Sequence, residues 1–88
     1  MISKNVLVVN KSGIHARPAS MFVGTAGKFK SKITITKDEK QGNAKSIFNI
    51  LALAIGSGSN VTISAEGEDA AEAVDSLVAL IESKFGEE

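Results

Sequence analysis

The chain has 88 residues, no cysteine, and ten basic side chains against ten acidic ones. This length fits one domain over residues 1–88. No apolar run approaches the roughly 20 residues of a membrane span, and no secretory signal is recognisable. We therefore expect a cytoplasmic protein without membrane insertion. The absence of cysteine excludes disulfides, thiol catalysis and thiolate metal sites, and the balanced charge disfavours nucleic acid as a partner.

In the first half of the chain, the patterns predict two strands separated by a helix. The apolar run Val6–Val9 predicts a strand with at least one buried face, and residues 10–13 have the chemistry of a turn. From Ala16, apolar residues recur at helical spacing, and we expect Gly27 to end this helix in the left-handed conformation. Residues 32–37 alternate between polar and apolar side chains, which predicts a strand with one buried face.

The second half of the chain predicts two further helices and another long strand. Residues 38–42 read as a turn that leads into a short return strand. Residues 61–65 alternate in the manner of a strand, and Asp69 is expected to begin the last helix with Glu72 completing a capping box. The second helix has apolar residues at helical spacing after Ser46 as its N-cap, namely Ile47, Ile50, Leu51 and Ala54. The buried stripe of the last helix is expected at Val74, Leu77, Val78, Ile81 and Phe85.

The predicted order of elements is therefore strand, helix, strand, short strand, helix, strand, helix. One-sided alternation in the strands indicates that one face of the sheet contacts solvent. The three amphipathic helices would cover the other face, and we therefore expect an α+β domain of two layers.

The one histidine, one arginine and one proline of the chain lie together, as His15, Arg17 and Pro18, after a Ser-Gly turn and at the start of the first predicted helix. A helix N-terminus has N–H groups without helical partners and the positive end of the helix dipole, so it binds anions. An imidazole there is a nucleophile, and a guanidinium suits phosphate oxygens. Pro18 fits the first turn because its missing N–H has no helical partner there. These residues predict a site at which a histidine nitrogen takes up a phosphoryl group.

Other interpretations of this cluster stay open on the sequence alone. A lone histidine in a loop is usually a solvent-exposed bystander, and an arginine in a first helical turn is usually a surface residue. A metal site needs three or four ligands, so we expect none here. A Ser-His-Asp triad is conceivable, but no nucleophile elbow and no group placed to orient the imidazole are recognisable.

The stretch Gly13-Ile14-His15-Ala16-Arg17-Pro18-Ala19 resembles the active-site signature of HPr, the histidine-containing phosphocarrier family of the phosphoenolpyruvate-dependent sugar phosphotransferase system. In addition, Lys45-Ser46-Ile47 falls where the family has a regulatory serine, and residues 63–67 resemble its last strand and turn. The resemblance covers the whole chain. It implies an open-faced β-sandwich, in which a four-stranded antiparallel sheet carries three helices on one face in the order β-α-β-β-α-β-α.

The resemblance also implies a phosphocarrier and not a stand-alone catalyst. His15 would accept a phosphoryl group on Nδ1 from enzyme I and pass it to a histidine on the A component of a sugar-specific enzyme II. Arg17 would pair with the phosphate, and the helix N-terminus of Ala16, Arg17 and Pro18 would stabilise it. No cofactor is implied, and we expect a monomer.

Ser46 is the second position of interest. As an ordinary N-cap it would contribute about 1 kcal/mol. For low-GC Gram-positive bacteria, the resemblance implies phosphorylation of this serine by HPr kinase/phosphorylase, which adds about two negative charges. These charges would hinder docking of enzyme I and could recruit the catabolite-control transcription factor. The chain has Phe48 and Asn49 where the regulated branch of the family usually has methionine and glycine.

We expect a partner-binding patch made by two helices, comprising Ala16, Ala19, Ser20, Ile47, Phe48 and Leu51. Ile47 and Leu51 also fit the buried stripe of their helix, so they could belong to the core instead. Phe48 lies off that stripe and is the better candidate for an exposed apolar anchor.

Two other functions compete with the carrier. One is a regulatory paralogue that acts chiefly through Ser46 phosphorylation in catabolite control, although such family members lack the active histidine. The other is a small RNA-binding module, which would expose aromatic side chains on its sheet for base stacking; all four phenylalanines lie outside the predicted strands. Nine of the ten basic residues fall within residues 1–45, which predicts either a mixed surface after folding or a basic face near a site in the first half of the chain.

Overall fold

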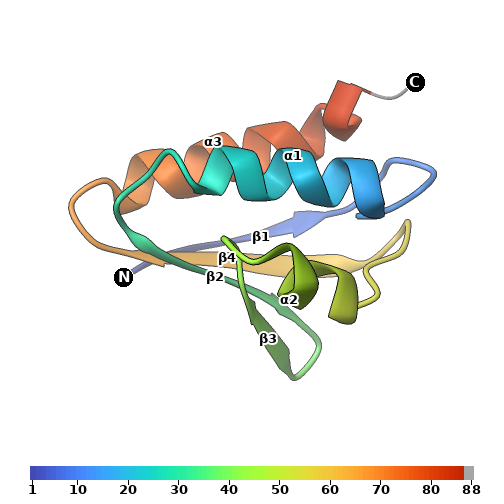
Figure 1. Ribbon diagram of the computed structural model, residues 1–88, viewed down its shortest axis with the longest axis horizontal. Helices are drawn as coiled ribbons and strands as arrows, with labels where there is room; N and C mark the ends of the chain where they lie inside the picture. Colours follow the sequence, from blue (N-terminus) through green and yellow to red (C-terminus); the bar gives the residue numbers. More distant parts are fainter. Residues whose placement is uncertain (87–88) are drawn as a thin grey trace.

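In the computed structural model, which describes residues 1–86, four strands form one sheet in the order β1-β4-β2-β3, and every pairing is antiparallel. The strands are β1 (Ile2–Leu7), β2 (Lys32–Lys37), β3 (Lys40–Asn43) and β4 (Asn60–Glu66). The last strand lies between the first and the second, so the N-terminal strand is held by a segment that is distant in sequence (Figure 1).

Three helices follow the predicted order: α1 (Ala16–Ala26), α2 (Ile47–Ala52) and α3 (Ala70–Glu82), with a short 3₁₀ helix, η1 (Lys84–Gly86), after the last. The two long helices, α1 and α3, lie side by side over the sheet and run in opposite directions (Figure 1). The short helix α2 contacts both α1 and β3. The predicted α+β open-faced sandwich is therefore confirmed. Within residues 1–86, no helix has the length and apolar character needed to cross a membrane.

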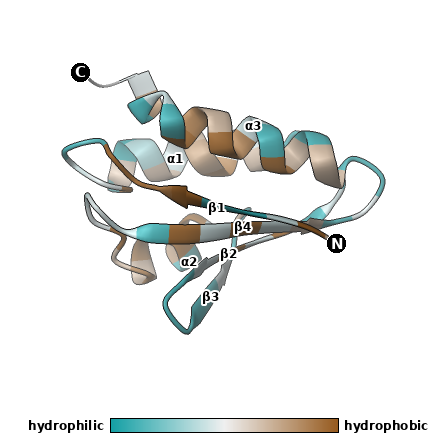
Figure 2. Ribbon diagram, turned by 180° about the vertical axis from the view of Figure 1, so that it is seen from behind, coloured by the Kyte–Doolittle hydropathy of each residue, from teal (hydrophilic) through white to brown (hydrophobic). Residues whose placement is uncertain are grey.

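The two faces of the sheet differ in the way that the alternation predicts. The predicted inward positions of β2 and β4 are buried, and so are the core positions Phe22 of α1 and Leu77 of α3. On the other face, polar side chains pair across strands; the Ser3 and Ser64 hydroxyls, for example, lie 2.9 Å apart. Figure 2 shows the corresponding mixture of apolar and polar residues along the strands and helices. The residues buried under the helices from β2 and β4 are Ile33, Ile35, Val61, Ile63 and Ala65.

The first strand and the end of the first helix differ from the prediction. β1 begins at Ile2 and ends at Leu7, because its polar first half pairs with β4, whereas Val8 bonds instead with the loop that precedes β4. Backbone pairing to a central strand thus extends the strand beyond its apolar run. Gly27 ends α1 as predicted, but the expected left-handed conformation is wrong, since this residue has φ −65° and ψ −16° and stays in the right-handed helical region.

Helix α2 and the end of the chain also depart from the predicted pattern. α2 ends at Ala52, and Ala54 lies outside it with φ 52°, in the left-handed region. Of the four residues expected on its buried stripe, Ile50 is fully buried, whereas Leu51 and Ala54 are exposed. Phe85 is buried as predicted, but it belongs to η1 and not to α3.

The predicted capping box of α3 is wrong, because the Asp69 side chain does not cap its own helix. Its carboxylate instead accepts the Ser31 hydroxyl and the backbone N–H groups of Lys30 and Ser31, the latter two at 2.8 and 2.9 Å. The hydrogen bond from the Ser31 hydroxyl, followed by that from the Lys30 N–H, lowers the pKa of Asp69. The side chain thus joins the start of α3 to the loop that precedes β2.

Candidate functional site

The loop before α1 holds its backbone tightly against the segment that precedes β4. Gly13 has φ 63°, and a Cβ built on it would lie 2.5 Å from the carbonyl oxygen of Ile55, so the position requires glycine. The Ile14 N–H donates to that same carbonyl at 2.9 Å, and the buried Asn10 side-chain amide donates to the Gly13 carbonyl at 2.7 Å. The chain therefore enters α1 in a fixed position.

His15 is the N-cap of α1. Its backbone is extended, with φ −85° and ψ −165°, and its carbonyl accepts the N–H of Ala19 at 2.7 Å. Its side chain is exposed and makes no capping hydrogen bond. The imidazole is therefore held at the positive end of an eleven-residue helix without being used by the fold.

The first turn of α1 supplies the surroundings of the imidazole. The N–H groups of Ala16 and Arg17 have no partner within the helix, while Pro18 is buried and fixes the backbone of the turn. Arg17 is exposed, and within residues 1–86 no hydrogen bond or ion pair engages its guanidinium. The cation is thus available to an anion that sits beside His15.

Two surface depressions meet at His15, and Ser12 borders both of them. The larger, of about 420 Å³, contains the first turn of α1 and ends at the last described residues of the chain. The smaller, of about 350 Å³, runs from His15 to the end of α2. The larger is lined by Ser12, His15, Ala16, Arg17, Pro18, Met21, Phe85 and Gly86, and the smaller by Ser12, Ile14, His15, Leu51, Ala54, Ile55 and Gly56.

The protein-family comparison decides the class of protein to which this site belongs. The family model described as "PTS HPr component phosphorylation site" matches residues 2–83. The chain belongs to the HPr family. It is 50% identical over 84 residues to the HPr-like protein Crh of Halalkalibacterium halodurans, covering 96% of this chain and 100% of that protein.

Solved HPr structures support the same assignment. The crystal structure of HPr-C-His from Thermoanaerobacter tengcongensis has a TM-score of 0.98 and 53% identity, and the match covers 100% of this chain and 99% of that one. A structure described as an HPr dimer from the same organism has a TM-score of 0.80 and 53% identity, over 99% of this chain and 100% of that one. The predicted resemblance to HPr is confirmed, whereas the expectation of a monomer stays a prediction.

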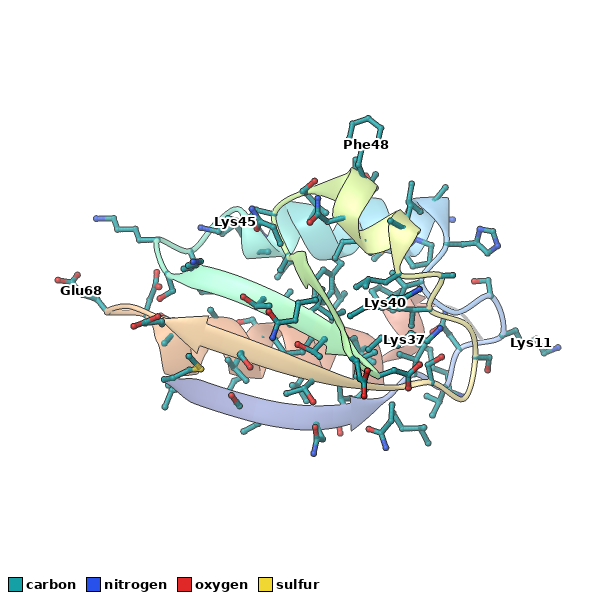
Figure 3. All side chains as sticks on the ribbon, turned by 90° about the horizontal axis from the view of Figure 1, so that it is seen from below. Lys11, Lys37, Lys40, Lys45, Phe48 and Glu68 are labelled. Atoms are coloured by element: carbon teal, nitrogen blue, oxygen red, sulfur yellow. The ribbon has the colours of Figure 1, made fainter. Side chains whose placement is uncertain are left out.

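Beside His15, the two helices α1 and α2 expose a mainly apolar surface that we call the α1–α2 patch; it consists of Ala16, Ser20, Ile47, Phe48 and Leu51. Phe48 is 81% exposed and projects away from the body of the protein (Figure 3), and Leu51 is 42% exposed. Ile47 is half-buried. Ala19 is fully buried under α1 and contributes nothing to this surface, so its predicted place in the patch is corrected.

Ser46 is the N-cap of α2, as predicted, and its hydroxyl oxygen accepts the Asn49 N–H at 3.4 Å. It also accepts the Asn49 side-chain amide at 3.0 Å, while the other end of that amide, Oδ1, accepts the N–H of Asn43 at 3.1 Å. Sequence reasoning missed this second role of Asn49. An asparagine three residues after an N-cap serine was the signal that could have shown it.

Within residues 1–86, no group of three or more histidine, cysteine or carboxylate side chains is placed to hold a metal ion. The phenylalanines occupy α1, the loop before β2, α2 and η1, so the described part of the sheet carries no aromatic ring for stacking bases. The site as built is a helix N-terminus with an exposed imidazole and an exposed guanidinium at its edge, next to a mainly apolar surface.

Proposed function

We propose that this HPr-family protein relays a phosphoryl group from phosphorylated enzyme I to the A component of a sugar-specific enzyme II, through His15. The observation that carries the proposal is the uncommitted imidazole at the N-cap of α1, with the unengaged Arg17 two residues on. The relay would take place in the cytoplasm and would need no cofactor.

In the loading step, the Nδ1 lone pair of His15 attacks the phosphorus of the phosphohistidine on enzyme I. A new N–P bond forms as the N–P bond of the donor breaks, so one bond replaces another and the donor histidine leaves as the neutral imidazole. In unloading, a histidine of the A component attacks the phosphorus on His15, its new N–P bond forms as the N–P bond to His15 breaks, and His15 leaves as the imidazole. Catalysis of such a transfer rests on positioning and on stabilisation of the equatorial oxygens.

The surroundings of His15 suit a temporary phosphate. The N–H groups of the first turn and the guanidinium of Arg17 would stabilise the phosphoryl oxygens, while Pro18 keeps the turn in place. Because His15 and Arg17 are both exposed, these interactions are weakened by solvent. A group held in this way can be passed on, whereas a buried one would be trapped.

The α1–α2 patch would dock both partners. The patch borders the histidine, because Leu51 and His15 line the same depression. An exposed aromatic ring is well suited as an interface anchor, and Phe48 is the most exposed large apolar side chain after Met1. A partner seated on Phe48 and Leu51 would bring its own histidine over His15.

Phosphotransfer with purified components tests this function. Incubation with phosphoenolpyruvate and enzyme I should add one phosphoryl group in a linkage that is labile to acid and stable to base. The gain should be lost in His15→Ala, kept in Ser46→Ala, and transferred when an A component is added. A wild-type protein that gains no phosphoryl group, or a His15→Ala variant that still gains one, would contradict the proposal.

We further propose that Ser46 is phosphorylated by an ATP-dependent HPr kinase/phosphorylase and that this modification controls docking. The relationship to proteins named Crh as well as HPr supports a regulatory branch. A phosphate on Ser46 would lie next to Ile47 and Phe48, and its charge would disturb an apolar contact through desolvation. It would thereby weaken the binding of enzyme I and favour the binding of the catabolite-control transcription factor.

A second candidate function is that of a regulatory paralogue acting chiefly through Ser46, which the 50% identity to a Crh protein favours. The two candidates differ in whether His15 is used. If His15 stays unmodified in the assay above while Ser46→Asp binds the transcription factor, the paralogue is the better description.

A further inference from the structure

The side chain of Asn49 connects three parts of the fold around Ser46. Its Nδ2 donates to the Ser46 hydroxyl oxygen at 3.0 Å, and its Oδ1 accepts the backbone N–H of Asn43, at the end of β3, at 3.1 Å. The Asn43 side chain in turn accepts the Lys45 N–H at 2.9 Å. Asn49 thus holds the Ser46 hydroxyl to the neighbouring strand, in addition to its backbone role in the cap.

The position of the Asn49 side chain is restricted by β3 beneath it. A Cβ built on Gly42 would lie 3.2 Å from the Cβ of Asn49, so these two residues are packed closely. If the Asn49 side chain rotates away from Ser46, both its bond to the hydroxyl and its bond to Asn43 break together. The amide is therefore held by two hydrogen bonds and not by one.

The two hydrogen bonds received by Ser46 bear on its reactivity. A serine hydroxyl has one proton and two acceptor lone pairs, and in this structure the oxygen accepts two N–H groups, both from Asn49. A hydroxyl that attacks phosphorus must direct a lone pair at it. Both lone pairs of the neutral hydroxyl are engaged by Asn49, so release of one of these bonds frees a lone pair for the attack, and the side-chain bond is the one that rotation can release.

We propose that Asn49 is a positioning residue that slows the phosphorylation of Ser46 by holding its hydroxyl in the cap. This inference rests on the proposed Ser46 regulation. In that reaction the Ser46 oxygen forms a bond to the γ-phosphorus of ATP, the bond from this phosphorus to the β–γ bridging oxygen breaks, ADP leaves, and the hydroxyl proton passes to a base of the kinase. Loss of the Asn49 amide should speed this step by about two- to tenfold, the range of one neutral hydrogen bond.

Asn49→Ala tests the proposal, because it removes the amide and keeps the Cβ that packs on Gly42. Initial rates of Ser46 phosphorylation are measured with HPr kinase/phosphorylase and ATP, at limiting and at saturating carrier. The rate at saturation should rise, because Asn49 acts after docking. Asn5→Ala is the matched control, since Asn5 also uses its side chain in a hydrogen bond, to Thr62 on the open face of the sheet. It should leave the Ser46 rate unchanged.

Two further measurements distinguish a local effect of Asn49 on the Ser46 hydroxyl from a general change in the fold. Loading of His15 by enzyme I should stay the same in Asn49→Ala, and both variants should remain folded, with similar thermal midpoints. An Asn49→Ala protein that is phosphorylated at Ser46 no faster than the wild type would overturn the proposal. Absence of Ser46 phosphate on both proteins would overturn it as well, together with the Ser46 regulation, while normal loading of His15 would leave the relay standing.

Discussion

The two long helices begin in opposite ways, at opposite ends of the molecule (Figure 1). At the start of α1 the backbone is pinned through Gly13, but the side chains of His15 and Arg17 are engaged by nothing in the described fold. At the start of α3 the Asp69 side chain itself makes the connection, with three hydrogen bonds to Lys30 and Ser31. A carrier needs the first arrangement, in which a fixed backbone presents side chains whose hydrogen bonds are kept for a ligand.

The largest expected effect comes from the pinned backbone at the start of α1. Gly13→Ala places a methyl group against the Ile55 carbonyl and strains a residue with φ 63°. We expect a loss of about 3 kcal/mol in the free energy of unfolding, measured by urea denaturation. Gly24→Ala is the control, because that helical position has open space around it and should gain stability. A Gly13→Ala variant as stable as the wild type would show that the loop is not held as described.

Removal of the Asp69 carboxylate should weaken the other end of the helix layer in a pH-dependent manner. The folded-state pKa of Asp69 is lowered, so the ionised carboxylate stabilises the fold above the pKa of the unfolded chain. That stabilisation is lost as the pH falls through the folded-state pKa, from about pH 4 downward. In thermal unfolding, Asp69→Ala should lower the midpoint at neutral pH and flatten its fall at acid pH.

Asp75→Ala on the same helix is the control for the Asp69 prediction. Asp75 pairs with Lys4 at 2.6 Å, but the two side chains are 62% and 53% exposed, and such pairs contribute little to stability. Its thermal midpoint should follow that of the wild type across the pH range. If the thermal midpoints of the two variants change with pH in the same way, the Asp69 hydrogen bonds do not stabilise the start of α3 as described.

Ala54→Gly should stabilise the protein by about 0.5–1 kcal/mol, because φ 52° is costly for a residue with a Cβ and free for glycine. Ala54 lies just before the segment that pins Gly13, so the change relieves strain close to the histidine. The comparison variant Ala52→Gly lies within α2 and should lose about 1 kcal/mol. Denaturant midpoints that move in the same direction for both variants would contradict this account.

The smallest change in stability is expected at Arg17, together with a large change in function. Arg17→Ala should alter the free energy of unfolding by less than about 0.5 kcal/mol, since nothing in the described fold contacts its charge. The rate of phosphoryl uptake from enzyme I should fall by at least about tenfold. Arg17→Lys should restore part of the rate, because it returns the charge without the planar fork. A variant that loads at the wild-type rate would remove Arg17 from the site.

The sequence was most informative where local chemistry and tertiary structure agree. Alternation located Ile33, Ile35 and Ile63 on the buried face, and the cap preference located Ser46, because in each case the residue type itself sets the geometry. The site cluster was also readable, since its residues are consecutive and a helix terminus gives them a shared role.

The features that the sequence did not reveal depend on partners distant along the chain. Asp69 has the residue type of a cap, but its carboxylate accepts hydrogen bonds from Ser31 in the loop before β2 and none from its own helix. The polar half of β1 becomes a strand because each of its residues pairs with a residue of β4. Ala19 was predicted in the partner-binding patch, yet the helix turns it into the core. The pairing of β1 and the hydrogen bonds of Asp69 do not follow from a local sequence pattern.

The last described residues, Phe85 and Gly86, line the same depression as His15 and Arg17, whereas Met1 lines another with Lys32 and Glu66. A fluorophore or affinity handle attached at position 86 would therefore border the depression that contains His15 and Arg17. The same attachment at Met1 would lie at the start of β1, whereas the other end of β1 leads into the loop before His15. Biosensors and surface-immobilised samples of this protein are therefore best tethered through the N-terminus.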